Sequence, residues 1–154
     1  MDQFLLHLRL LNELLEKKLR VLTQILNITE NQQSVITAGA SGSEVLRLYE
    51  GMSEEKQRLI DAVIKGDRVF EQTYREIGPV FEKEGPRHAG LVKRMQEGIR
   101  RVTALDARIR VREARMGITR PQAVRAADNA ARKRAVSAYE RNKSGHKNNL
   151  PRGK

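Results

Sequence analysis

Apolar side chains recur at alternating steps of three and four residues through three long segments, and this spacing constrains the fold more than any other feature. The first stripe consists of Phe4, Leu8, Leu11, Leu15, Leu22 and Ile25. Lys18 fills the position that the stripe skips. Further leucines widen the stripe, as suits a helix that contacts two neighbours: Leu5, Leu14, Leu19 and Leu26. We expect a helix from about Asp2 to about Gln33.

A second stripe predicts a helix of similar length. It starts at Ser41, which is spaced for a capping box with Glu44, or at Ser43, and the sequence leaves both starts open. The stripe consists of Val45, Tyr49, Met52, Lys56, Leu59, Val63, Gly66, Phe70, Thr73 and Ile77. Within a helix, Gly51 and Gly66 each cost roughly 1 kcal/mol relative to Ala, so each marks a close helix approach or a soft point.

A third helix is expected after the segment GPVFEKEGP (78–86), whose Gly and Pro residues predict a turn. It starts at about Pro86 or Arg87 and ends at about Met116, with Gly117 as its C-terminal stop. Its stripe consists of Val92, Met95, Ile99, Val102, Ile109 and Met116, with Asp106 and Glu113 in the same register. Three long helices joined by short turns predict an all-α fold, an elongated antiparallel three-helix bundle over residues 1–117.

The composition of the remaining residues, 118–154, predicts a basic tail that is only marginally helical. A fourth helix from about Thr119 to about Arg141 has an apolar face made mostly of alanine. Such a face buries little area, so packing weakly offsets the entropy of ordering it. We expect this helix to become ordered on a partner, and the chain beyond Lys143 to be disordered.

Charge is distributed unevenly along the 154 residues, whose net charge is +11. Residues 1–86 contain 11 Lys and Arg against 14 Asp and Glu, a net charge of −3. Residues 87–117 have a net charge of +6, and residues 118–154 of +8. A basic C-terminal half of this kind could follow a phosphate backbone, so a nucleic-acid- or ribosome-associated helical protein is one hypothesis.

Catalysis, metals and cofactors have little support in the sequence. The chain has no Cys, and its three His are dispersed without a second ligand at metal-binding spacing. No phosphate-binding glycine loop follows a strand, and no Ser has His and Asp partners. We therefore expect a protein that is not an enzyme, with no catalytic residues, metal or cofactor. The charged N-terminal segment is neither a signal peptide nor a membrane span, so we expect a soluble protein without membrane insertion.

Some apolar surface exceeds what a three-helix core requires. Ala107, Val111 and Ala114 lie outside the main register of the third helix. Spare apolar surface on a charged bundle is typical of a protein that binds an amphipathic helix of a partner. A coiled-coil oligomer is a further hypothesis for such a chain.

The first two helical segments also carry a resemblance to a known family. Three successive segments resemble the FlgN class of flagellar type III export chaperones. They are LLNELLEKKLRVLTQIL, then NQQSVITAG, then LRLYEGMSEEKQRLIDAVIKGDRVFEQTY. The pattern covers roughly residues 3–80 and extends to the third helix in architecture alone. The strongly basic tail is a departure, because helical export chaperones are often acidic or neutral.

The resemblance implies a cytoplasmic chaperone that binds the amphipathic terminal helix of hook–filament junction (hook-associated) proteins. It would prevent their premature assembly and deliver them to the export gate or ATPase components of the flagellar secretion system. The family docks on the export gate through a tyrosine, for which Tyr139 is the candidate here. We expect the third helix and the tail to hold the client through Val111, Met116, Val124, Ala127, Ala131, Ala135 and Tyr139.

Overall fold

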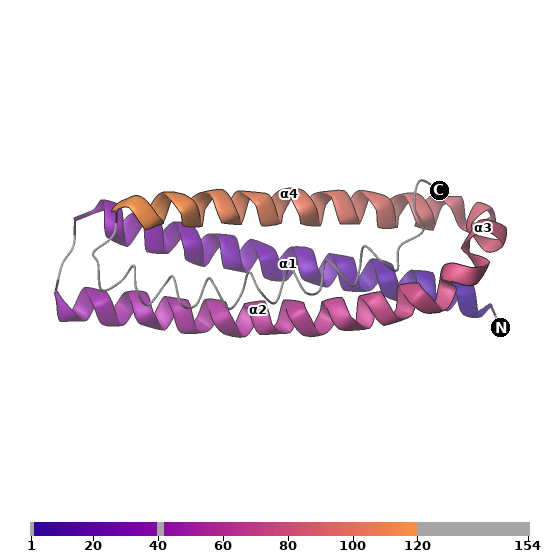
Figure 1. Ribbon diagram of the computed structural model, residues 1–154, viewed down its shortest axis with the longest axis horizontal. Coiled ribbons are helices and arrows are strands. Elements are labelled where there is room, and N and C mark those ends of the chain that lie inside the picture. The colour runs from indigo at the N-terminus through magenta and orange to yellow at the C-terminus, as the bar shows by residue number, and fades with distance from the viewer. Residues whose placement is uncertain (1, 40–41, 120–154) are drawn as a thin grey trace.

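The computed structural model describes residues 2–39 and 42–119, and all of its regular elements are helices. Three of them are long: α1 (Gln3–Thr37), α2 (Ser43–Ile77) and α4 (Ala89–Thr119). They lie side by side in an elongated arrangement (Figure 1). The prediction of an all-α protein with long helices is confirmed. The capping box at Ser41, the helix expected to Arg141 and the disordered end beyond Lys143 lie outside the described residues.

Helix α1 is longer than its apolar pattern predicts. Asp2 caps its N-terminus, because one carboxylate oxygen accepts a hydrogen bond of 3.2 Å from the Leu5 backbone N–H. The expected end at Gln33 is wrong by one turn, since polar side chains there bond back to the helix backbone rather than stopping it. The Thr37 hydroxyl donates to the Gln33 carbonyl at 2.8 Å. The chain leaves the helix at Gly39, whose φ of +70° favours glycine.

The predicted turn between the second and third helices is itself helical. It consists of η1 (Gly78–Val80), α3 (Phe81–Glu84) and η2 (Gly85–His88). Aromatic rings hold it against the long helices: Phe81 packs edge-on against Phe4 and stacks with Tyr74, each at a centroid distance of 6.0 Å. Glycine and proline here shape short helical turns instead of an irregular loop.

Helix α4 begins and ends slightly later than predicted. Pro86 lies in the preceding 3₁₀ turn rather than at the first position of the helix. The expected stop at Gly117 is wrong, because α4 continues to Thr119 and Gly117 does not adopt a positive φ. Glycine permits a left-handed helix end without requiring one.

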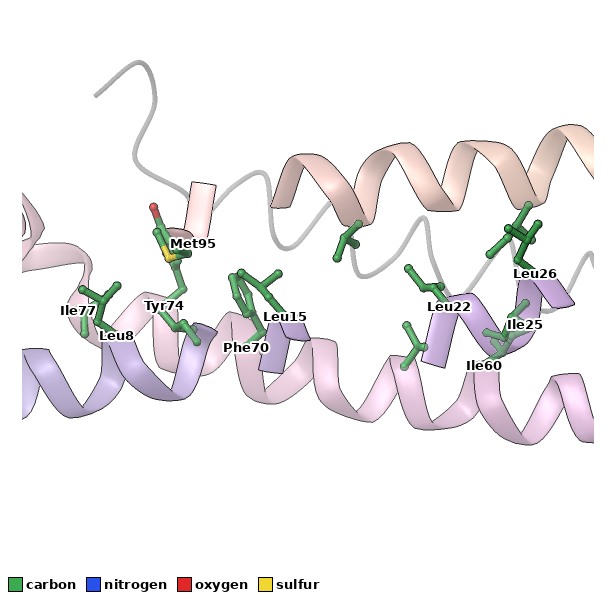
Figure 2. Close-up of a cluster of buried hydrophobic side chains, with 14 of the residues drawn as sticks. Leu8, Leu15, Leu22, Ile25, Leu26, Ile60, Phe70, Tyr74, Ile77 and Met95 are labelled. Atoms are coloured by element: carbon green, nitrogen blue, oxygen red, sulfur yellow. The ribbon is translucent and has the colours of Figure 1, made fainter. Parts of the chain in front are cut away.

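The core lies along α1, which packs against both α2 and α4 over much of its length. Within the described part of the chain, the backbones of α2 and α4 do not come comparably close to each other, although their side chains meet in the same core. Leu8, Leu11 and Leu22 are completely buried. Figure 2 shows α1 leucines meeting side chains of its neighbours, including Phe70 and Tyr74. The apolar stripe predicted for α1 is therefore confirmed as the centre of the core.

The helical glycines differ in the space around them. A Cβ at Gly98 would lie 3.1 Å from Leu15 Cδ1, so α4 approaches α1 closely at that point. For Gly51 and Gly66, no described atom lies within 4 Å of such a Cβ. Glycine thus permits a close helix approach at Gly98. Gly51 and Gly66 agree instead with the other interpretation, in which each is a soft point of its helix.

Replacing these glycines with alanine should have opposite effects on stability. Gly51→Ala lies on an exposed part of α2 and should raise the free energy of unfolding by about 0.5–1 kcal/mol. Gly98→Ala should lower it by about 1 kcal/mol, because overpacking against Leu15 exceeds the gain in helix propensity. Urea denaturation followed by circular dichroism measures both. Equal stabilisation by the two substitutions would contradict the close approach at Gly98.

Candidate partner-binding surface

Two of the seven predicted contact residues lie within the described chain, and their environments differ. Val111 is 50% exposed on α4 and is available to a partner. Met116 is completely buried, so its side chain is not on the surface of this structure. The other predicted contacts lie beyond the described residues: Val124, Ala127, Ala131, Ala135 and Tyr139.

The outward side of α4 combines small apolar and cationic side chains. The three residues expected to lie outside the core register, Ala107, Val111 and Ala114, are all exposed. Arginines surround them, and those that are also exposed are Arg100, Arg101, Arg108, Arg110 and Arg115. This side of α4 faces away from α1, because Met95, Val102 and Ile109 occupy the inward side. We call it the outer face of α4.

A buried polar cluster joins the three long helices near the turn that connects α1 to α2. The Lys56 ammonium of α2 lies 3.1 Å from Glu113 Oε1 of α4 and 2.8 Å from Gln32 Oε1 of α1. Thr29 Oγ1 accepts a further hydrogen bond from it at 3.3 Å. Gln32 in turn donates to Ser53 Oγ at 2.9 Å. Each helix therefore contributes to one network, in which Lys56 is the common donor.

The ion pair in this cluster is largely shielded from water. The side chains of Lys56 and Glu113 are 7% and 16% exposed, respectively. Sequence spacing placed both in the core register of their helices but did not show that they meet. One sequence signal could have identified the Lys56–Glu113 ion pair. A lysine interrupts one apolar stripe, and a glutamate interrupts another. A buried charge requires a partner of opposite charge.

Other polar contacts fix α1 against its neighbours. Lys18, at the skipped position of the α1 stripe, forms an ion pair of 2.7 Å with Asp67 of α2. The Asn12 amide donates at 3.2 Å to the Leu91 carbonyl of α4. Since each contact joins a fixed position on one helix to a fixed position on another, together they favour one axial register of the helices.

The described histidines are paired with acidic groups rather than gathered into a metal site. His7 lies 3.3 Å from Glu76, and His88 lies 3.1 Å from Asp2. The backbone hydrogen bond from Leu5 lowers the pKa of Asp2, and His88 contributes in the same direction. Burial raises the pKa of the Tyr74 phenol. Among residues 2–39 and 42–119, no group of three or more His, Asp or Glu could hold a metal ion.

A shallow depression of about 350 Å³ lies where the ends of α1 and α4 meet. Five of its six lining residues are of polar or charged type, and the full set is Glu30, Gln33, Ser34, Thr37, Ala38 and Arg112. Arg112 closes one side through a 3.0 Å hydrogen bond to Gln33 and a 3.5 Å ion pair with Glu30. Pockets for small molecules are lined predominantly by hydrophobic and aromatic side chains, and none of the residues around this depression is aromatic or a large aliphatic residue.

Comparison with known proteins identifies no relative: no protein-family model, no curated protein and no solved structure matches the chain. The described helices also include none that is both long enough and apolar enough to cross a membrane.

Removing one partner from the buried cluster should destabilise the protein strongly. Lys56→Met leaves Glu113 and Gln32 without their common donor, and we expect a loss of about 2–4 kcal/mol in the free energy of unfolding. Arg75→Met, which breaks the exposed Arg75–Glu71 pair, is the control and should cost less than about 1 kcal/mol. Urea denaturation measures both.

The double variant Lys56→Met/Glu113→Leu should be more stable than the sum of its single variants predicts, because neither charge is then left buried alone. Strict additivity of the two substitutions would contradict a coupled ion pair.

Proposed function

We propose that the protein is a cytoplasmic flagellar export chaperone of the FlgN class. In this proposal it is not an enzyme, and it binds the amphipathic terminal helix of hook–filament junction proteins. It keeps these clients from assembling early and delivers them to the flagellar type III export apparatus. The resemblance of residues 3–80 to that class is the basis for naming the clients and the export machinery.

The proposal rests on the apolar surface that α4 still exposes after its inward side has packed against α1. Ala107, Val111 and Ala114 are exposed although α4 already packs against α1 through Met95, Val102 and Ile109. An amphipathic helix of a client presents an apolar stripe that such a surface can cover. Covering that stripe lowers the tendency of the client to aggregate before export.

We propose that α1, α2 and α4 act as an antiparallel three-helix scaffold, and that α4 and residues 118–154 hold the client. The scaffold needs a fixed shape, which the leucine core and the Lys56 cluster favour. The tail is alanine-rich and basic, so its contribution would come from folding on the client. Tyr139 is the proposed contact with the export gate.

The exposed arginines of α4 favour a second candidate function, which is binding of nucleic acid or association with the ribosome. Arg108 and Arg110 are exposed, and Arg132, Lys133 and Arg134 extend the basic character into the tail. We place this second, because no aromatic side chain lies between Ala89 and Gly117 to stack on bases. Tight binding of duplex DNA or RNA that falls steeply between two salt concentrations would favour it.

Removal of residues 118–154 tests the chaperone proposal. We expect the shortened chain to keep the helical circular dichroism signal and cooperative melting of its long helices, since the leucine core lies within α1, α2 and α4. Its affinity for purified junction proteins, measured by fluorescence anisotropy, should fall at least about tenfold, a difference of about 1.4 kcal/mol. Unchanged affinity would contradict a binding role for the tail.

A further inference from the structure

Arginine occurs at every seventh position along α4, at Arg94, Arg101, Arg108 and Arg115. Seven residues of an α-helix rise about 10.5 Å and make nearly two complete turns, so these side chains form one row along the helix. The notable property of this row is its regular repeat, which matches the repeat of a second helix packed alongside.

Most of this arginine row has no acidic partner within the described part of the chain. Arg94, at the start of the row, forms an ion pair with Glu16 of α1. Arg101, Arg108 and Arg115 are exposed and form no such pair there. Nearby arginines on other sides of α4 do have partners: Arg110 pairs with Asp106, and Arg112 pairs with Glu30. Of the five exposed cations of α4 without an ion pair in the described part of the chain, three belong to the row, and the other two are Lys93 and Arg100.

An exposed apolar strip runs beside the arginine row. It consists of Ala104, Ala107, Val111 and Ala114, which follow each other at steps of three, four and three. These are the steps of a coiled-coil seam, and in that register the arginines occupy the flanking positions that select the charge of a partner helix. Between Ala104 and Ala114, the outer face of α4 thus follows a second heptad register, separate from the one that packs on α1.

We propose that the outer face of α4 binds an amphipathic helix with Asp or Glu at heptad spacing beside its apolar stripe. This inference rests on the proposed function, and it specifies the chemistry of the client helix and the place where it docks. Alanine at the seam lets the partner backbone approach closely and leaves space for large apolar side chains of the client. Its carboxylates then meet Arg101, Arg108 and Arg115.

Charge and apolar surface together favour a helix over a nucleic acid at this face. A phosphate backbone would use the arginines but would leave the Ala and Val strip without a partner, and the strip offers no aromatic ring for stacking. An acidic amphipathic helix can cover the apolar strip and pair with the arginines at the same time, because its own heptads also repeat about every 10.5 Å. The partner is consequently defined by two properties, an apolar stripe and acidic flanks.

The test is a charge reversal in the full-length chain. The variant Arg101→Glu/Arg108→Glu/Arg115→Glu reverses the row, and Arg47→Glu/Arg58→Glu/Arg68→Glu makes the same change in net charge on exposed positions of α2. The probes are the purified junction proteins and two labelled synthetic helices of four heptads. Both peptides have Leu at the seam, and one has Glu and the other Lys at the flanking positions. Fluorescence anisotropy gives the affinities, and circular dichroism confirms that each variant is folded.

We expect the Glu peptide to bind the full chain and the Lys peptide to bind at least about tenfold more weakly. The α4 variant should lose about tenfold or more in affinity for the Glu peptide and for the junction proteins, whereas the α2 variant should change by less than about threefold. If the α4 variant fails to fold, Arg101→Gln/Arg108→Gln/Arg115→Gln replaces it, with the same direction of effect expected.

The outcomes separate this inference from the proposed function. Junction proteins that bind the full chain and the α4 variant equally well would overturn the docking site and leave the chaperone proposal standing. Binding of the Glu peptide with no binding of any junction protein would support the chemistry of the face and overturn the proposed clients. Equal affinity for the two peptides, or binding of duplex RNA but of neither peptide, would overturn the inference itself.

Discussion

Burial of the leucine face of α1 against two helices at once is the interaction on which the rest of the described structure depends. Leu8, Leu11 and Leu22 are completely enclosed, whereas the backbones of α2 and α4 do not come comparably close to each other. The position of each outer helix is therefore set mainly by its contact with α1. Because the inward side of α4 is used in this contact, its outer face is left for other interactions.

Leucine stripes alone tolerate sliding of one helix past another, and the polar contacts reduce that freedom. Lys56, Gln32 and Glu113 join all three long helices near one end, while Lys18 and Asp67 join α1 to α2 farther along. A shift of one helix by a turn would leave these charges buried without partners. On this account the apolar stripes hold the helices together, and the polar clusters select their register.

Sequence reasoning recovered the helices and the buried stripe because both follow from a periodicity within one helix. It did not recover the meeting of Lys56 with Glu113, because two residues 57 positions apart are brought together by packing and not by spacing. It also read Gly117 as a stop and residues 78–86 as a turn, although packing of Phe81 on Phe4 and Tyr74 keeps the latter segment helical. Val111 was identified correctly as exposed surface, and Met116, proposed beside it, is buried.

The proposed function links a scaffold with a fixed register to an outer face that is both apolar and basic. The most direct measurement is isothermal titration of the full-length chain with purified hook–filament junction proteins. We expect at least one junction protein to bind with a dissociation constant of about 1 μM or lower. No detectable binding to any junction protein would contradict the proposed function.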